Sequence, residues 1–144
     1  MPDPNSMNTA KGRDFQKRAA EILTRHFKVR FHTEFPILIG DPPKYHKFDL
    51  VSDDQRYIGE CKNYSWTETG NVPSAKMGFI NEAVFYLQHI PRDKERFIVL
   101  RRDVNVKRKE SLAEFYYRTN KHLLNGVYII KIDVLNETVK ILDK

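Results

Sequence analysis

Residues 47–62 read KFDLVSDDQRYIGECK, and this stretch decides the fold. Polar and apolar residues alternate over residues 47–51 and again over residues 56–62, which is typical of half-buried strands. Two consecutive aspartates, Asp53 and Asp54, lie between the two runs and predict a turn. We therefore expect residues 47–62 to form a β-hairpin.

This hairpin is expected to complete a three-stranded meander. Residues 29–39 mix β-branched and aromatic side chains, which favour an extended strand. The segment ends at residues 40–43, Gly-Asp-Pro-Pro, where the prolines cannot donate to a β-ladder. Upstream, apolar residues recur at helical spacing among lysines and arginines from about residue 9 to residue 27. A basic amphipathic helix should therefore precede the meander.

The rest of the chain alternates helices and strands. We expect a helix over residues 74–90, a strand at 97–100, a helix over 111–124, and strands at 127–134 and 139–142. A strand–helix–strand connection implies parallel pairing of residues 56–62 with residues 97–100, whereas the meander implies antiparallel pairing. The sequence thus predicts an α/β fold, with a central mixed sheet, an αβββαβ core and flanking helices.

Length and composition indicate one domain. The chain has 144 residues, of which 40% are hydrophobic, enough to fill one core over residues 10–144. Residues 1–9 are polar and proline-containing, so we expect a disordered tail there. No apolar run approaches the ~18 residues of a membrane span, and the start lacks the basic and apolar regions of a secretory signal. We therefore expect a cytoplasmic protein with no membrane contact.

The charge balance favours anionic partners. Twenty-five Lys and Arg residues against 19 Asp and Glu residues give a formal net charge of +6. A basic surface lowers the free energy of approach to a polyphosphate through counterion release, but many proteins are basic for solubility alone. A basic cluster at residues 101–109 is open to both explanations.

Two carboxylates and an ammonium group are expected to converge on the hairpin. Side chains alternate along a strand, so Glu60 and Lys62 project from the same face. The turn pairs the two strands and brings Asp49 beside Glu60. The alternative is a surface strand that carries a solvated Glu/Lys pair of little energetic value.

Such a cluster suits a hard divalent cation. Two neighbouring acids repel each other unless a cation compensates, and Mg²⁺ takes oxygen ligands. Asp49, Glu60 and the main-chain carbonyl of Cys61 would form half of a coordination shell, and water would complete it. Lys62 could orient the attacking water and stabilise charge on a phosphate, which predicts a phosphodiester hydrolase.

The segments Lys47-Phe-Asp49 and Gly59-Glu-Cys-Lys62 resemble the motif of the PD-(D/E)xK nuclease superfamily, which includes restriction endonucleases, archaeal Holliday-junction resolvases and many phage and repair nucleases. The similarity covers the αβββαβ order from about residue 11 to residue 101, including the helix entry Lys11–Phe15. It implies a restriction-endonuclease-like three-layer fold and a Mg²⁺-dependent deoxyribonuclease, an endonuclease, in which Mn²⁺ can replace Mg²⁺. The resemblance makes Asp49 and Glu60 metal ligands and places Lys62 at the attacking water.

The chain departs from the family pattern at two positions. Phe48 replaces the proline that names the motif, a common variation. Gln16 stands where many members place a first-helix glutamate that assists the metal, although an amide oxygen can still coordinate or hold a water. Related nucleases also often place a polar residue on the second helix near the metal, which makes Gln88 a candidate; an ordinary polar helix residue is the alternative.

Five residues are candidates for contact with DNA. Lys44, His46 and Lys47 precede the first acid and could meet backbone phosphates, whereas a solvated loop is the alternative. Lys76 lies in the first turn of a predicted helix, where its charge opposes the helix dipole, so either a phosphate or plain exposure explains it. Trp66 follows the active strand and could stack on a base, join a dimer contact or pack onto its own core.

Two functions remain open. The first is a Mg²⁺-dependent nuclease that cuts DNA. The second is a catalytically weak or inactive nuclease-fold protein that binds nucleic acid or a protein partner, which the neutral Gln16 motivates. The chain is too short for a separate recognition domain, so we expect structure-directed or nonspecific cutting unless a homodimer or another partner adds specificity.

Overall fold

The computed structural model of the protein describes residues 4–103, 105 and 107–142. In this part of the chain, three α-helices and six β-strands follow one another in the order α-βββ-α-β-α-ββ, which confirms the expected α/β class. The elements are α1 (Pro4–Phe27), β1 (Phe31–Ile39), β2 (Lys44–Ser52), β3 (Tyr57–Lys62), α2 (Ser74–Leu87), β4 (Glu95–Arg101), α3 (Leu112–Asn120), β5 (Tyr128–Asp133) and β6 (Thr138–Ile141). A 3₁₀ turn, Lys121–Leu123, follows α3.

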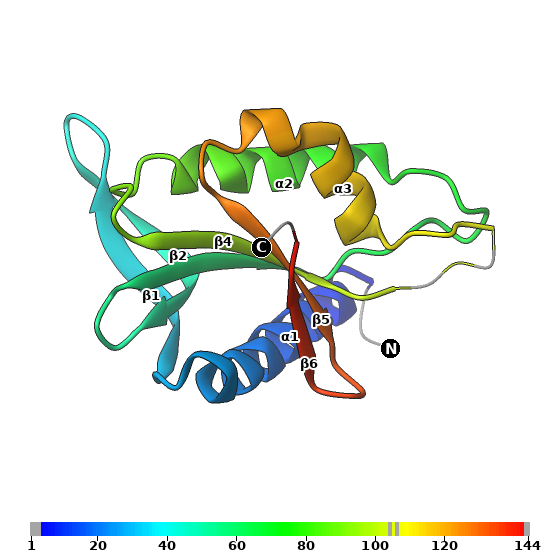
Figure 1. The fold of residues 1–144 in the computed structure, drawn as a ribbon, viewed down its shortest axis with the longest axis horizontal. Coiled ribbons are helices and arrows are strands. Elements are labelled where there is room, and N and C mark those ends of the chain that lie inside the picture. The colour runs from blue at the N-terminus through cyan, green and yellow to red at the C-terminus, as the bar shows by residue number, and fades with distance from the viewer. Residues whose placement is uncertain (1–3, 104, 106, 143–144) are drawn as a thin grey trace.

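The strands form one mixed sheet in the order β1-β2-β3-β4-β5-β6. The β1–β2–β3 meander is antiparallel, β3, β4 and β5 run parallel, and β6 returns antiparallel. The crossover from β3 to β4 through α2 therefore has the predicted parallel pairing. Helix α1 covers one face of the sheet, and α2 and α3 cover the other (Figure 1).

Each face of the sheet buries its own apolar core. Strand β4 shows how one run supplies both: Phe97 and Val99 point toward α1, whereas Ile98 and Leu100 point toward α2 and α3. This explains why residues 97–100 are apolar without alternation, since the strand is covered on both sides. Helix α3 begins with the expected capping box, in which the Ser111 hydroxyl accepts the Glu114 N–H at 3.2 Å.

The first helix is longer than its pattern predicts. It begins at Pro4 rather than near residue 9, and most of the stretch that we expected to be a tail is therefore helical. Residues 1–3 of that expected tail lie outside the described residues. No helix within the described part of the chain is long and apolar enough to cross a membrane.

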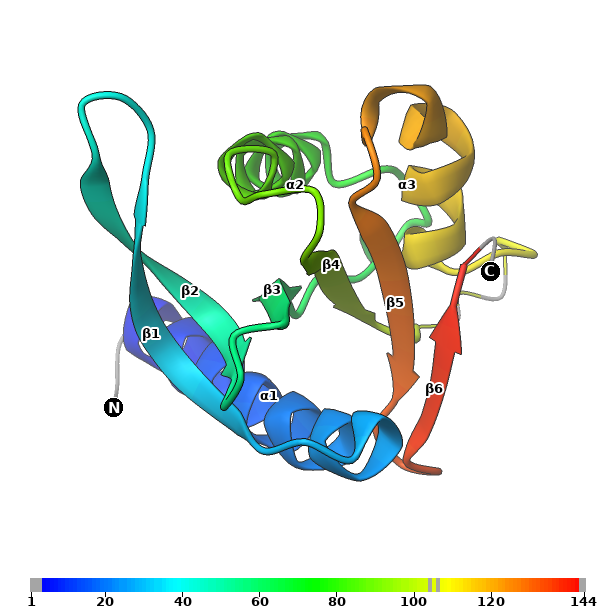
Figure 2. The ribbon, with the colours of Figure 1, turned by 60° about the vertical axis from the view of Figure 1, so that its left-hand side comes forward.

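The β1–β2 hairpin projects beyond the rest of the sheet and rises on one side of β3, opposite α2 (Figure 2). Its side chains change faces near Asp49: Phe48 packs on the α2 side, whereas Leu50 packs on the α1 side. On β1, the neighbouring residue Glu34 adopts φ 52°, so the regular pleat is interrupted there as well. Because the alternation of side chains is interrupted here, the Asp49 side chain does not project squarely from either face of the sheet.

Candidate active site

The two acids meet where β2 and β3 separate. The ladder between these strands pairs Leu50 with Gly59 and Val51 with Ile58. Further along, side chains take over: the main-chain N–H of Cys61 donates to Asp49 Oδ2 at 2.8 Å, and that of Asp49 donates to Glu60 Oε2 at 3.3 Å. The strands therefore fork at Gly59, and both carboxylates occupy the fork, as the hairpin pattern leads one to expect.

Gly59, the residue before Glu60, leaves room for a ring of the neighbouring strand. A Cβ atom at this position would lie 2.2 Å from the Phe97 ring, so only glycine allows that ring to pack over the strand. The next residue, Glu60, faces α2 and is 6% exposed, whereas the side chain of Cys61 packs on the α1 side. Burial raises the pKa of the Cys61 thiol, so its contribution to the fork is the main chain.

Helix α1 supplies a third group. The Gln16 amide Nε2 donates to Asp49 Oδ1 at 3.0 Å and approaches the Asp49 main-chain oxygen at 3.4 Å. The structure thus brings Gln16 to the position that its sequence register predicts. Its amide nitrogen, rather than its oxygen, faces the carboxylate, so it orients Asp49 without adding charge.

His46, a candidate for phosphate contact, lies half-buried in this cluster. Its Nε2 lies 3.0 Å from Glu60 Oε1. The ring stacks on Tyr86 at a centroid distance of 4.1 Å and meets Phe48 edge-on at 4.6 Å. Desolvation in this aromatic setting lowers the pKa of His46, which favours the neutral ring. The alternation of β2 turns His46 inward, and sequence reasoning did not place α2 against it.

A small cavity of about 100 Å³ opens beside Glu60. Strand residues His46, Glu60 and Lys62 form one wall, so the structure brings Lys62 to the acids as expected. Helix α2 forms the other wall with residues at helical spacing: Phe79, Glu82, Ala83 and Tyr86. The sequence does not single out this wall, because residues on every face of a helix share the i, i+3, i+4, i+7 spacing.

Glu60 is the electrostatically strained member of the pair. Burial, together with the hydrogen bond and negative charge of Asp49, raises the pKa of Glu60 to about 10, and Lys62 only partly offsets this. Without a further cation, Glu60 therefore holds a proton at neutral pH. Within the described residues, no group of three or more His, Cys, Asp or Glu side chains is arranged to hold a metal. Any cation here would thus depend on two carboxylates, main-chain oxygen and water.

Gln88 lies elsewhere, contrary to expectation. It follows the last turn of α2, and its Nε2 donates to the Leu123 main-chain oxygen at 2.9 Å. It lines a different cavity, together with Asn81 and Tyr116. The physical reason is helical phase, because Gln88 shares a helix face with Asn81 and Phe85 and not with the wall beside Glu60.

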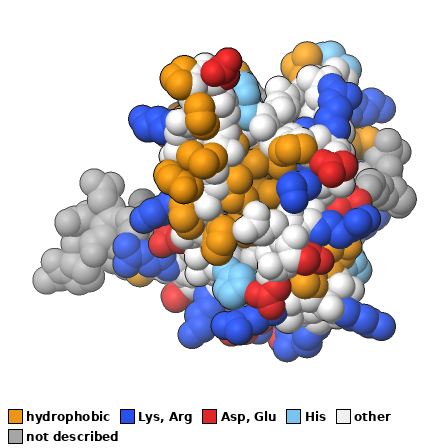
Figure 3. Space-filling model, turned by 90° about the vertical axis from the view of Figure 1, so that its left-hand side faces the viewer, with side chains coloured by type: hydrophobic (Ala, Val, Ile, Leu, Met, Phe, Trp, Pro, Cys, Tyr) orange, Lys and Arg blue, Asp and Glu red, His pale blue; other side chains and the backbone are white. Residues whose placement is uncertain are grey.

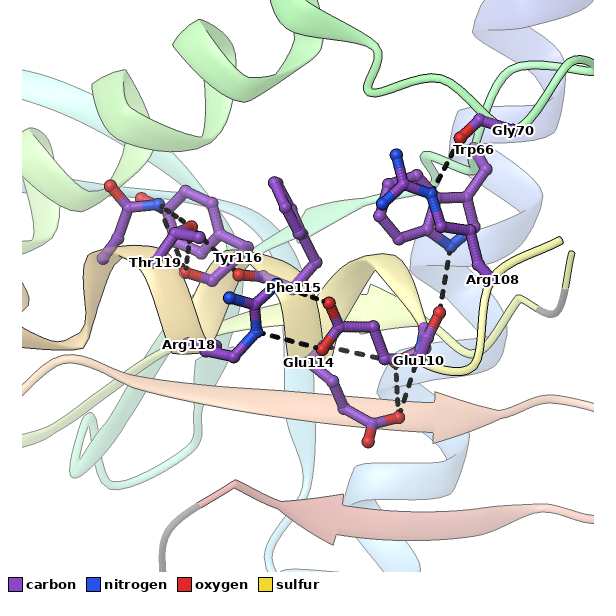
Figure 4. Close-up of polar contacts among 11 residues, drawn as sticks. Trp66, Gly70, Arg108, Glu110, Glu114, Phe115, Tyr116, Arg118 and Thr119 are labelled. Atoms are coloured by element: carbon purple, nitrogen blue, oxygen red, sulfur yellow. Dashed lines mark hydrogen bonds and ion pairs between the residues drawn. The ribbon is translucent and has the colours of Figure 1, made fainter.

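Trp66 is buried and cannot stack on a base. Its ring is 6% exposed, its Nε1 donates to the Glu110 main-chain oxygen at 3.2 Å, and the Arg108 guanidinium covers it at 4.2 Å (Figure 4). Arg108 is itself fixed by donating to the Gly70 main-chain oxygen at 2.8 Å. Of the three open interpretations, packing onto its own core is therefore correct for Trp66.

The three lysines proposed for DNA contact are all exposed. Lys44 and Lys47 lie on β2, three residues apart, so their side chains leave opposite faces of the hairpin. Lys76 lies at the start of α2, and its Nζ is 5.3 Å from the centroid of the Tyr64 ring. Their positions are compatible with phosphate contact, which stays a prediction.

A larger groove lies on the α1 side of the sheet, where β3, β4 and β5 end. It encloses about 800 Å³, and Asn63 lies in its wall, immediately after Lys62. Four basic side chains line it against two acids, Asp14 and Asp133. Two of these cations are ion-paired, Arg18 with Glu137 and Arg102 with Asp133; the other two are the exposed Lys11 and Arg101.

Comparison with known proteins adds no family. No protein-family model matches the chain, and no curated protein matches it. The structure therefore supports an α/β protein with a mixed sheet, and any function must be argued from the geometry at the fork.

Proposed function

We propose that the protein is a metal-dependent nuclease that acts on DNA and has the restriction-endonuclease-like fold of the PD-(D/E)xK superfamily. One observation carries the proposal: Asp49, Glu60 and Lys62 converge at the β2–β3 fork, where Lys62 compensates the negative charge of the carboxyl pair only in part. The order of α1, the meander, α2 and β4 agrees with the αβββαβ core of that superfamily.

The donor set fits Mg²⁺, and Mn²⁺ would substitute. The Asp49 and Glu60 carboxylates offer hard oxygen ligands, and the raised pKa of Glu60 shows that ionising both acids is unfavourable while no cation is bound. The N–H and C=O of a strand residue point to the same side of the strand. Because the Cys61 N–H donates to the Asp49 carboxylate, the Cys61 carbonyl also faces the fork. When bound, a divalent ion would neutralise phosphate charge and lower the pKa of a water.

The chain's own residues orient and stabilise the reacting groups. Gln16 holds the Asp49 carboxylate, and His46 holds Glu60. Lys62 lies in the same cavity as Glu60, where its ammonium group can orient an attacking water and stabilise negative charge on a phosphate. The nearly complete burial of Glu60 excludes bulk water, which strengthens each of these interactions.

The test is cleavage of a supercoiled plasmid and of a circular single strand of DNA in Mg²⁺, Mn²⁺ and EDTA. Lys62→Ala should reduce the rate by about 10²–10³-fold, as expected for the loss of one group that stabilises a transition state. Lys140→Ala, which removes an exposed lysine from β6, is the matched control and should cut like wild type. Full activity in EDTA, or equal activity of the two variants, would contradict the proposal.

A second candidate is a nucleic-acid-binding protein with weak or no catalysis. All four carboxylate oxygens of Asp49 and Glu60 already have a hydrogen-bond partner in the protein, and Gln16 contributes no charge. A cation would have to replace some of these hydrogen bonds, which lowers the free energy gained when it binds. Calorimetric titration with Mn²⁺ separates the candidates, because heat that disappears in Asp49→Asn supports the nuclease and its absence in wild type supports the binder.

A further inference from the structure

Helix α2 exposes two phenylalanines that differ in what surrounds them. Phe79 is 52% exposed and Phe85 is 60% exposed. Phe79 lines the cavity that holds Glu60 and Lys62, whereas Phe85 lines the separate cavity beside Tyr116. Hydrophobic side chains also gather in the middle of the face that carries the hairpin, with Lys and Arg around them (Figure 3). Phe79 is thus the exposed ring of α2 that lies beside the candidate active site.

Access to the acids is narrow. Glu60 is 6% exposed and lines a cavity of about 100 Å³. The hairpin and α2 stand on either side of the strand that carries it (Figure 2). Paired bases hold a duplex as a stiff rod with a persistence length of about 150 base pairs, so bending it locally into so small an opening costs free energy that a single strand does not require. A strand with unpaired nucleotides can turn one phosphate inward.

Cations alternate with aromatic rings along this opening. Lys62 lies inside the cavity, and Lys76 precedes Phe79 by three residues on α2, so both side chains leave the same face of the helix. The Lys76 ammonium also lies over the Tyr64 ring. Glu82 is the one acid on the helix wall of this cavity among the described residues. Basic groups interleaved with exposed rings are the pattern that binds single-stranded nucleic acid, since phosphates pair with cations and bases stack on rings.

We infer that Phe79 stacks on an unpaired base next to the phosphate that enters the cavity, so the substrate is a nucleic-acid strand with unpaired nucleotides and not a continuous duplex. This inference rests on the proposed function, because it takes the cavity beside Lys62 as the place of the scissile phosphate. It makes Phe79 a specificity-determining residue that acts through its exposed ring.

Binding in EDTA tests the inference without cleavage. Fluorescence anisotropy would compare a labelled single strand of about 20 nucleotides with a hairpin duplex of the same sequence. Phe79→Ala should weaken binding of the single strand by about five- to 150-fold and leave duplex binding unchanged. Phe79→Tyr should bind like wild type. Phe85→Ala is the matched control, an equally exposed ring on the same helix, and should also bind like wild type.

The outcomes separate this inference from the proposed function. Unfolding midpoints of Phe79→Ala and Phe85→Ala should agree, because both rings are half-exposed. If Phe79→Ala binds the single strand as wild type does, or if Phe79→Ala only dissociates a dimer in sedimentation, the inference is wrong even when Lys62→Ala slows cleavage as expected. If the single strand binds through Phe79 but Mg²⁺ supports no cutting, Phe79 stacks on a base in a nucleic-acid-binding protein, and both the hydrolase and its scissile phosphate are wrong.

Discussion

The main-chain N–H of Asp49 donates to the carboxylate of Glu60 at 3.3 Å, and Asp49 in turn accepts the N–H of the residue after Glu60 at 2.8 Å. The two acids thereby replace the ladder bonds that β2 and β3 would otherwise form at the fork. The hydrogen bonds that satisfy these two main-chain N–H groups also hold the two carboxyl groups close together in a buried site. A proton on Glu60 relieves their repulsion while no cation is bound.

The first prediction concerns stability against pH in EDTA. The pKa of Glu60 is about 10 in the folded protein and starts from an ordinary value of 4.5. Between these values the folded state holds a proton that the unfolded chain lacks, so stability must fall as pH rises. The limiting slope is about 1.4 kcal/mol per pH unit, or about 2 kcal/mol from about pH 7 to about pH 8.5. Urea unfolding of wild type and Glu60→Gln measures it.

Glu60→Gln should remove that part of the slope, because glutamine keeps the neutral shape of the protonated acid. Glu68→Gln, which replaces an exposed loop acid, should keep it. Starting at about pH 7 leaves the lowered pKa of His46 below the measured range. Parallel pH profiles for wild type and Glu60→Gln would show that Glu60 is already ionised in the folded protein, and the electrostatic argument for a cation would fail.

The sequence was sufficient to predict the sheet and the pairing of the two acids, because both depend on local pattern. Alternation and a two-aspartate turn define the hairpin, and the hairpin alone brings Asp49 beside Glu60. The parallel connection to β4 follows from the length of the intervening helix. These are contacts between segments that are close in sequence or whose connection has a fixed geometry.

The walls of the cavity could not be predicted in the same way. Whether His46 points at Glu60 or at solvent depends on how α2 lies across the hairpin, and that packing joins segments about 40 residues apart. Trp66 illustrates the same limit, since its burial depends on Arg108 and on the loop before α3. Gln88 was misplaced for a related reason: it lies two residues after Tyr86, about 200° around the helix axis from the face beside Glu60, and it contacts Leu123 instead.

The second prediction concerns the neutral residue on α1. Gln16→Glu replaces a donor to Asp49 with a third carboxylate, so the metal-free protein should lose about 1–3 kcal/mol of stability. The added charge should strengthen binding of Mn²⁺ by about tenfold or more, since affinity for a hard cation follows the ligand charge. Calorimetry and thermal unfolding with and without Mn²⁺ measure both effects. Gln88→Glu, on the far face of α2, should change neither the affinity nor the Mn²⁺-dependent stabilisation.

The third prediction separates Trp66 from nucleic-acid binding. Trp66→Ala should destabilise the protein by about 3–5 kcal/mol, because it empties a buried site and leaves Arg108 without its ring. The affinity of the remaining folded protein for a DNA oligonucleotide should not change. Unfolding in urea gives the first quantity, and anisotropy at a temperature where the variant is folded gives the second. If Trp66→Ala lost affinity for DNA while keeping the wild-type stability, Trp66 would belong to the binding surface and the prediction would be wrong.

The last prediction concerns the groove on the α1 side. Arg101 and Lys11 are its exposed cations, whereas Arg18 and Arg102 are held by acids. If a backbone phosphate lies against each exposed cation, Arg101→Ala and Lys11→Ala should each lower the slope of log K against log salt by about 0.7 to 0.9. Lys140→Ala, outside the groove, should leave the slope unchanged. Equal slopes for all three variants would mean that nucleic acid reaches Lys62 without crossing this groove, and that its phosphates do not contact Lys11 or Arg101.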